Sequence, residues 1–182
     1  MNESVTQYAS TLFGYIIGYL LPGLFALITI SMWFPNAIEV YKVFETANST
    51  TGIFLLAILF ALMLGIELTA FRFVFYDCFL CKLFFKIDDF NNADVKQLAD
   101  EKQLKAFKYL VDQHYKYHEF WGNVSIVIPV FFCGTLHVKL IAWNTCSFVI
   151  YASVMLAIFI VTVFAALNAY HKYVKRTNAL FQ

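Results

Sequence analysis

Four long apolar stretches follow one another along the chain and are separated by polar connections. They cover residues 12–34, 52–75, 120–137 and 146–170. A helix that crosses a bilayer needs about 20 mostly apolar residues, and each stretch is close to that length. The pattern therefore predicts an all-α integral membrane protein with four transmembrane helices.

The longest hydrophilic region separates the second and third stretches. Asp88 and Asp89 interrupt the apolar pattern there, and from residue 93 onward apolar residues recur at helical spacing as far as the third stretch. Lysines and acidic residues alternate on the polar side, which is typical of a solvated helix face. The sequence predicts a helical insert that runs into the third span without a long loop.

Composition and charge add an orientation. Hydrophobic residues make up 61% of the 182 residues and charged residues 14%, against about 45–50% and 25% in soluble domains. Eleven of the 13 Lys and Arg lie between residues 72 and 116 or after residue 171, whereas the other two connections carry only Lys42 and Lys139. The positive-inside rule places such regions in the cytoplasm. We therefore expect a multi-pass protein of the inner (plasma) membrane, with both termini cytoplasmic.

These predictions divide the chain into four parts. Residues 12–75 form transmembrane helices one and two, residues 76–119 a cytoplasmic helical insert, residues 120–170 helices three and four, and residues 171–182 a cytoplasmic tail. The chain has no glycine-rich nucleotide loop, HExxH or GxSxG motif. We predict neither an enzyme nor a cofactor.

One carboxylate, Glu67, lies inside the second span. Acidic residues within a membrane are costly and mark functional sites by default. Every other span places polar residues at a similar depth, and we predict that the set lines a pore or gate: Glu67, Tyr15, Tyr19, Asn123, Ser125 and Asn168. The alternative is static packing, in which Glu67 pairs with Arg72 or another polar neighbour. Otherwise Arg72 is free to extend its charge to the headgroups.

Helix breakers and small residues lie close to that depth. Pro22 and Pro129 interrupt their spans and predict hinges. Gly14 and Gly18, four residues apart, predict close packing against another helix. Because the core of one four-helix bundle fills with side chains, a pore would need several copies of the chain, and we expect a homo-oligomer.

The hydrophilic insert offers two further sites. Lys102, Lys105 and Lys108 predict binding of an anionic ligand on the cytoplasmic side, a nucleotide or a nucleic acid. Two pairs, Cys78 with Cys81 and His114 with His118, have the internal spacings of a Cys2His2 zinc site. The separation between the pairs exceeds that of zinc fingers, so we predict no metal and keep zinc as an alternative.

The chain combines a few spans, a cytoplasmic helical insert with scattered lysines and no enzymatic motif. This plan resembles the small multi-pass membrane effectors of bacterial antiphage systems. The resemblance implies an oligomeric channel, gated by a nucleotide or oligonucleotide from a partner enzyme, that depolarises the cell. Two other functions stay open. One is a non-conducting adaptor that docks a cytoplasmic protein partner. The other is a small transporter, against which the halves of the chain show no clear internal repeat.

Overall fold

The computed structural model describes residues 12–34, 50–80, 83, 101–138 and 144–180, and every element among them is helical. The elements, in chain order, are η1 (Ile16–Leu20), α2 (Leu21–Trp33), α4 (Thr50–Arg72), η2 (Phe73–Leu80), α6 (Glu101–Leu110), η4 (Val111–Tyr115), α7 (Lys116–His137) and α8 (Thr145–Leu180). The predicted all-α class is confirmed for these residues.

Four helices are long and apolar enough to cross a membrane. They cover Leu12–Trp33, Thr51–Leu80, Lys116–His137 and Thr145–Leu180. Each corresponds to one predicted span, so the four predicted helices are present and have the length and apolar composition of transmembrane helices. The second, third and fourth are longer than predicted, because the helical backbone continues past the apolar stretches and includes charged residues such as Asp77, Lys116 and Lys172.

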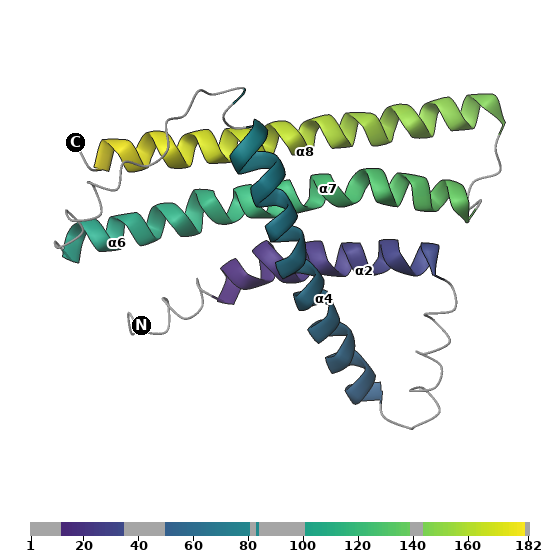
Figure 1. Cartoon of the computed structure of the whole chain (residues 1–182), viewed down its shortest axis with the longest axis horizontal. Coiled ribbons are helices and arrows are strands. Elements are labelled where there is room, and N and C mark those ends of the chain that lie inside the picture. The colour runs from purple at the N-terminus through teal and green to yellow at the C-terminus, as the bar shows by residue number, and fades with distance from the viewer. Residues whose placement is uncertain (1–11, 35–49, 81–82, 84–100, 139–143, 181–182) are drawn as a thin grey trace.

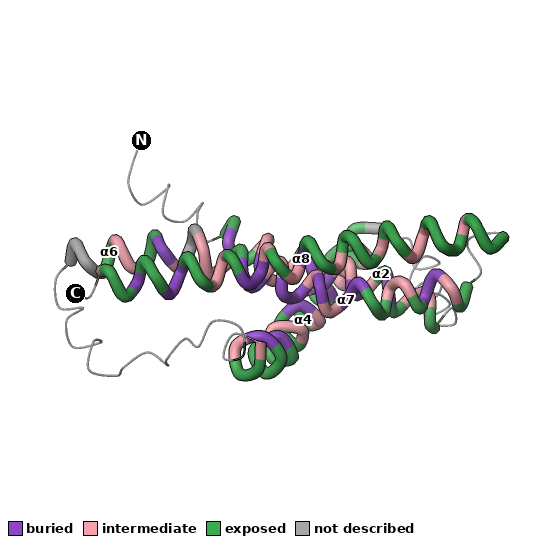
Figure 2. Tube along the Cα trace, turned by 90° about the horizontal axis from the view of Figure 1, so that it is seen from above, coloured by how far each residue is buried: buried purple, intermediate pink, exposed green. Residues whose placement is uncertain are grey.

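Three of these helices lie side by side, and the fourth crosses them. α2, α7 and α8 form a layer, whereas α4 runs obliquely across one face of that layer (Figures 1 and 2). α4 packs mainly on α2 and also touches α7. A side chain at Gly23 would lie 1.7 Å from the Ala61 carbonyl oxygen, and one at Gly65 would lie 2.1 Å from the Tyr19 carbonyl oxygen. The crossing therefore depends on two glycines that let the backbones touch.

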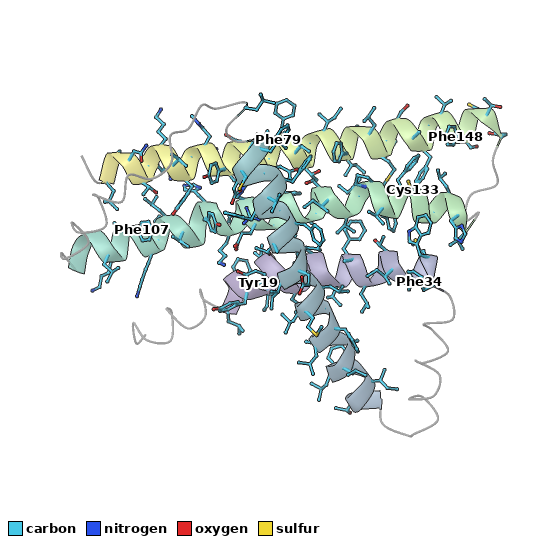
Figure 3. The ribbon with its side chains drawn as sticks, in the orientation of Figure 1. Tyr19, Phe34, Phe79, Phe107, Cys133 and Phe148 are labelled. Atoms are coloured by element: carbon cyan, nitrogen blue, oxygen red, sulfur yellow. The ribbon has the colours of Figure 1, made fainter. Side chains whose placement is uncertain are left out.

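The outer surface of this arrangement is apolar. Only 11% of the most apolar window of the second span is buried, and 6% of the corresponding window in α8. Exposed positions run along both helices (Figure 2). The large apolar side chains exposed on them include Leu59, Met63, Val161 and Phe164, and side chains project outward from both helices (Figure 3). Such a surface is stable in lipid and would aggregate in water.

The helical insert joins the third span as predicted. α6, η4 and α7 follow one another without a break from Glu101 to His137. Leu110 of α6 packs with Tyr173 and Val174 of α8, and Phe107 lies against the same cluster. Residues 171–180, predicted as a tail, thus form the helical end of α8. Residues 81–82 and 84–100 of the insert lie outside the described residues.

Among the described residues, three segments have π-helical winding: η1, η2 and η4. In a π-helix the backbone bonds join residues five apart, which widens the helix and changes which side chains share a face. Such segments are rare and occur frequently at functional sites. Each of the three contributes at least one tyrosine to the polar site described next.

Candidate functional site

A buried ion pair lies where α4 passes into η2. Arg72 Nη1 donates to both carboxylate oxygens of Asp77, at 3.0 and 3.2 Å. The side chain of Arg72 is 1% exposed and that of Asp77 10%. Arg72 therefore neither pairs with Glu67 nor extends to the headgroups, which corrects both expectations. The π-helical winding of η2 brings these residues together although they are five apart.

His118 of α7 is the third member of this cluster. Its Nδ1 lies 2.9 Å from the carbonyl oxygen of Ala166 in α8, and its Nε2 lies 2.8 Å from Asp77 Oδ1. A carbonyl oxygen only accepts, so Nδ1 must carry a proton. The second contact also needs a proton, on Nε2 or on Asp77. Because Asp77 also accepts two bonds from the Arg72 guanidinium, the three side chains form one connected polar cluster.

Tyrosines enclose this charged cluster. The ring of His118 lies 4.8 Å from that of Tyr170, 6.0 Å from that of Tyr115 and 6.1 Å from that of Tyr76. Arg72 Nη2 donates to the Tyr115 hydroxyl at 3.4 Å. Burial raises the pKa of Tyr115, so its phenol stays protonated at neutral pH. The aromatic shell keeps the charges together in a medium of low dielectric constant. Removal of one partner would leave the other as an uncompensated buried charge, which strongly destabilises the fold.

A second polar group joins the first three spans. Asn123 Nδ2 donates to the Gly18 carbonyl oxygen at 3.1 Å and to Thr69 Oγ1 at 3.0 Å. Ser125 donates to the Gly122 carbonyl oxygen, so the neighbouring Tyr76 hydroxyl donates to Ser125. These bonds satisfy buried polar groups without water. Two buried atoms, Arg72 Nε and Asn123 Oδ1, have no partner among the described residues.

A third group connects α7 with η1. Lys116 Nζ lies 2.7 Å from Glu119 Oε2 and 3.2 Å from the Tyr19 hydroxyl. The ammonium group also lies 4.8 Å from the centre of the Tyr19 ring and 5.8 Å from that of Tyr15. Lys116 thus combines an ion pair with two cation–π contacts.

The predicted polar layer therefore separates into two kinds of residue. Tyr19, Asn123 and Ser125 are used in hydrogen bonds within one subunit, as the packing alternative expects. Tyr15 is exposed beside Lys116, and Asn168 is exposed on α8. Glu67 is also exposed, and it has no hydrogen bond or ion pair with any described residue. Of the predicted set, Glu67 is the only charged side chain, and Asn168 likewise has no hydrogen bond with a described residue.

Glu67 borders an apolar groove between three helices. The groove has a volume of about 210 Å³ and lies between α2, α4 and α7. Its walls are apolar apart from Glu67 and Thr29, and the Thr29 hydroxyl donates to the Phe25 carbonyl oxygen of its own helix. Phe71 lies one turn after Glu67 in the same wall. The surface of the groove is almost wholly apolar, so Glu67 contributes carbon atoms of its side chain to it and not its carboxylate oxygens.

The predicted glycines and prolines have mixed outcomes. Gly14 and Gly18 are buried, but the side chains of Lys116 and Glu119 cover them, whereas the close backbone contacts occur at Gly23 and Gly65. Pro22 is buried near the start of α2, directly after η1, and Pro129 lies exposed inside α7. Both prolines occupy helical positions at which bending would be centred.

The residues of the zinc alternative do not converge. His118 is bonded to Asp77 and Ala166, and His114 Nε2 accepts a bond from Arg176 Nη1 at 2.6 Å. Cys78 is exposed on η2, and Cys81 lies outside the described residues. Over the part of the chain that the structure describes, no three His, Cys, Asp or Glu side chains are grouped to hold a metal ion.

The predicted lysine site is described only in part. Lys105 and Lys108 are exposed on α6, and the side chain of Lys102 lies outside the described residues. Arg176 of α8 is bonded to His114, and burial first, then the charges of Arg176 and Lys172, lower the pKa of this histidine. Sequence reasoning overlooked this contribution of α8 to the basic end of the molecule.

No protein-family model, curated protein or solved structure matches the chain. The functional argument therefore rests on the geometry above. Sequence reasoning also missed the cluster of Arg72, Asp77 and His118, although these three are charged or titratable residues within apolar helices. That chemistry is the signal that could have found them, since isolated charges in a membrane need partners.

Proposed function

We propose that the chain is the subunit of a homo-oligomeric membrane channel, or membrane-permeabilising effector, in which Glu67 faces the conducting path. The observation that supports this function is the unpaired, exposed carboxylate of Glu67. It lies near the middle of the candidate span Thr51–Leu80, with roughly 20 Å of helix on either side.

Several copies of the chain are needed because a carboxylate exposed to lipid is energetically unfavourable. Polar groups at this depth face a bundle interior or a water-filled cavity. Within one described subunit, Glu67 faces neither, because it is exposed on the side of the molecule where α4 lies. A ring of subunits that turned this face inward would give the carboxylate water and would surround a path for cations.

The cytoplasmic gate belongs to the same proposal. The paired ends of α6 and α8 expose Lys108, Lys172, Lys175 and Arg176, a surface that suits an anionic nucleotide or oligonucleotide. Such a ligand would act on two helices that continue directly into spans three and four. Its binding should weaken steeply as salt rises, since phosphate contacts release counterions.

Cation flux across liposomes that contain the purified protein tests the proposal. We expect flux through the wild type, a severalfold change in flux or cation preference for Glu67→Gln, and wild-type behaviour for Met63→Leu. The control residue Met63 is exposed one turn earlier on α4. A high-salt wash before the assay removes any bound polyanion that holds the channel shut.

One result would overturn the channel, and another would overturn the role of Glu67 in it. Vesicles that stay tight after the wash would favour the adaptor, whose unpaired carboxylate would be covered by another membrane protein. Equal currents in the wild type and in Glu67→Gln would remove this residue from the path.

A further inference from the structure

The end of α8 carries a cationic surface that continues the exposed apolar side of the same helix. We propose that Lys172, Lys175 and Arg176 bind the headgroup of an anionic phospholipid in the adjoining leaflet. This binding requires neither conduction nor a soluble ligand, so it goes beyond the proposed channel. Lys108 lies six residues before His114, on the helix that leads away from the third span, and stays available to a soluble anion.

Spacing along α8 puts these cations on one face of the helix. Asn168, Lys172 and Arg176 follow one another at intervals of four residues, and Lys175 lies seven residues after Asn168. Residues at these spacings share a helix face. All four are exposed, because the other side of the helix packs against α6 and η4.

The positive charge of this face is not neutralised by the described protein. None of the three cations forms an ion pair with a described carboxylate. Arg176 Nη1 donates one hydrogen bond to His114 Nε2, at 2.6 Å. The acceptor is a ring nitrogen without negative charge, so the contact orients the guanidinium and leaves its charge uncompensated. The remaining N–H groups of the guanidinium can bind a phosphate.

The position of the cations along α8 matches the headgroup layer of a bilayer. From Cys146 to Leu167 the helix has no charged residue, and at about 1.5 Å per residue this stretch extends roughly 33 Å. The hydrocarbon core is about 30 Å thick, so the cations begin just beyond it. Helical side chains lean toward the N-terminus of their helix, which for α8 is toward the membrane. The charged ends of Lys172 and Arg176 can therefore reach the lipid phosphates.

Continuity with an apolar surface distinguishes a lipid from a soluble anion. The face that carries Lys172 continues toward the membrane through Asn168 and Val161, and Val161 and the neighbouring Phe164 are both exposed. Acyl chains can lie on these apolar side chains while the phosphate binds the cations. The Asn168 amide has no hydrogen bond with a described residue and can donate to an ester oxygen of the same lipid. Basic clusters beside a membrane span are typical of binding to anionic lipids.

Energy transfer from tryptophan to pyrene-labelled lipid tests this binding, with the full-length protein in phosphatidylcholine nanodiscs. Trp121 packs against Ala166 and Leu167 and so reports from the same end of α8. The two probes are pyrene-labelled phosphatidylglycerol and pyrene-labelled phosphatidylcholine, which share their chains and phosphate but differ in net charge. We expect phosphatidylglycerol to be enriched beside the wild type.

A double variant, Lys172→Gln with Lys175→Gln, removes two of the cations and keeps the contact of Arg176 with His114. The enrichment should fall about fivefold or more, since each lysine near an anionic surface contributes about that factor. Lys105→Gln with Lys108→Gln is the matched control, because it changes two exposed lysines of α6 at the same spacing. This control should keep the enrichment of the wild type.

Three results would overturn the lipid site. They are equal enrichment of the two lipids, equal losses in the two double variants, and displacement of phosphatidylglycerol by ATP but not by sodium chloride of the same ionic strength. The last result would assign the cations to a soluble ligand. Lipid selectivity in a protein whose vesicles stay tight would refute the channel and support this site. Flux that depends on Glu67 without lipid selectivity would do the reverse.

Discussion

At the scale of single residues, Asp77 is the centre of the described polar core. It accepts from Arg72 and contacts His118, so one carboxylate joins η2 to α4 and α7. A buried charge of this kind is stable only while its partners remain, because the low dielectric medium penalises whichever charge is left alone.

Asp77→Asn should therefore destabilise the protein strongly. The substitution leaves the buried guanidinium of Arg72 without a counter-charge, and the expected loss is about 3–5 kcal/mol of unfolding free energy. Reversible unfolding in mixed micelles measures it. Glu67→Gln is the matched control, the same chemical change at an exposed site, with an expected effect within about 0.5 kcal/mol. Similar losses in both variants would contradict the assigned role of Asp77.

At the scale of helices, the crossing of α2 and α4 depends on glycine. Gly23→Ala would place a methyl group 1.7 Å from the Ala61 carbonyl oxygen, so the helices must separate. We expect a loss of about 1–3 kcal/mol or more. Gly14→Ala is the control, because its nearest new neighbour is Lys116 Cγ at 3.6 Å, an ordinary contact. Thermal unfolding of the two variants distinguishes this crossing from the predicted Gly14–Gly18 packing.

The contact between η4 and α8 should respond to pH. His114 accepts a bond from Arg176, which requires a neutral ring at Nε2. Burial first, then the charges of Arg176 and Lys172, lower the pKa of His114 below its ordinary value of about 6.5. At pH values between the lowered pKa of the folded protein and the ordinary value, the unfolded chain therefore binds more protons than the folded protein. This contribution to stability is fully present above about pH 6.5 and is lost as the pH falls through the folded pKa.

His114→Gln isolates this effect, because glutamine accepts from Arg176 but does not titrate. Histidine changes its charge between about pH 8 and about pH 5. As the pH falls through roughly this range, the wild type should lose more thermal stability than the variant. The rest of the chain is the same in both proteins, so every other effect of pH cancels in the difference. Parallel losses would show that His114 makes no contribution.

These elements also show what sequence could and could not predict. The four spans follow from apolar length alone, and the passage of the insert into the third span follows from its periodic apolar residues. The end of α8 was missed because its lysines suggested a tail, although Tyr173, Val174 and Thr177 repeat at helical spacing and are buried. Arg72 and Asp77 were not paired because ordinary α-helical spacing does not place residues five apart together. His118 joins them through tertiary packing, which no local pattern reveals.

At the scale of the whole molecule, the distribution of Lys and Arg predicts its orientation. Phe107 lies towards one end of the helix layer and Phe148 towards the other (Figure 3). In a cysteine-free background, a membrane-impermeant maleimide added to intact cells should label restored Cys146 but not Lys108→Cys. Permeabilised cells should label both. The reverse pattern in intact cells would place the basic end outside.

The length of α8 has a mechanical consequence. Its 36 residues extend about 54 Å, whereas the hydrocarbon core of a bilayer is about 30 Å thick. The helix from α6 to α7 is comparably long and continuous. No loop separates the basic end of either helix from its membrane span, so a movement of that end would be transmitted along the helix into the span. A sideways displacement of a few ångströms at the outer ends would therefore tilt spans three and four within the bilayer.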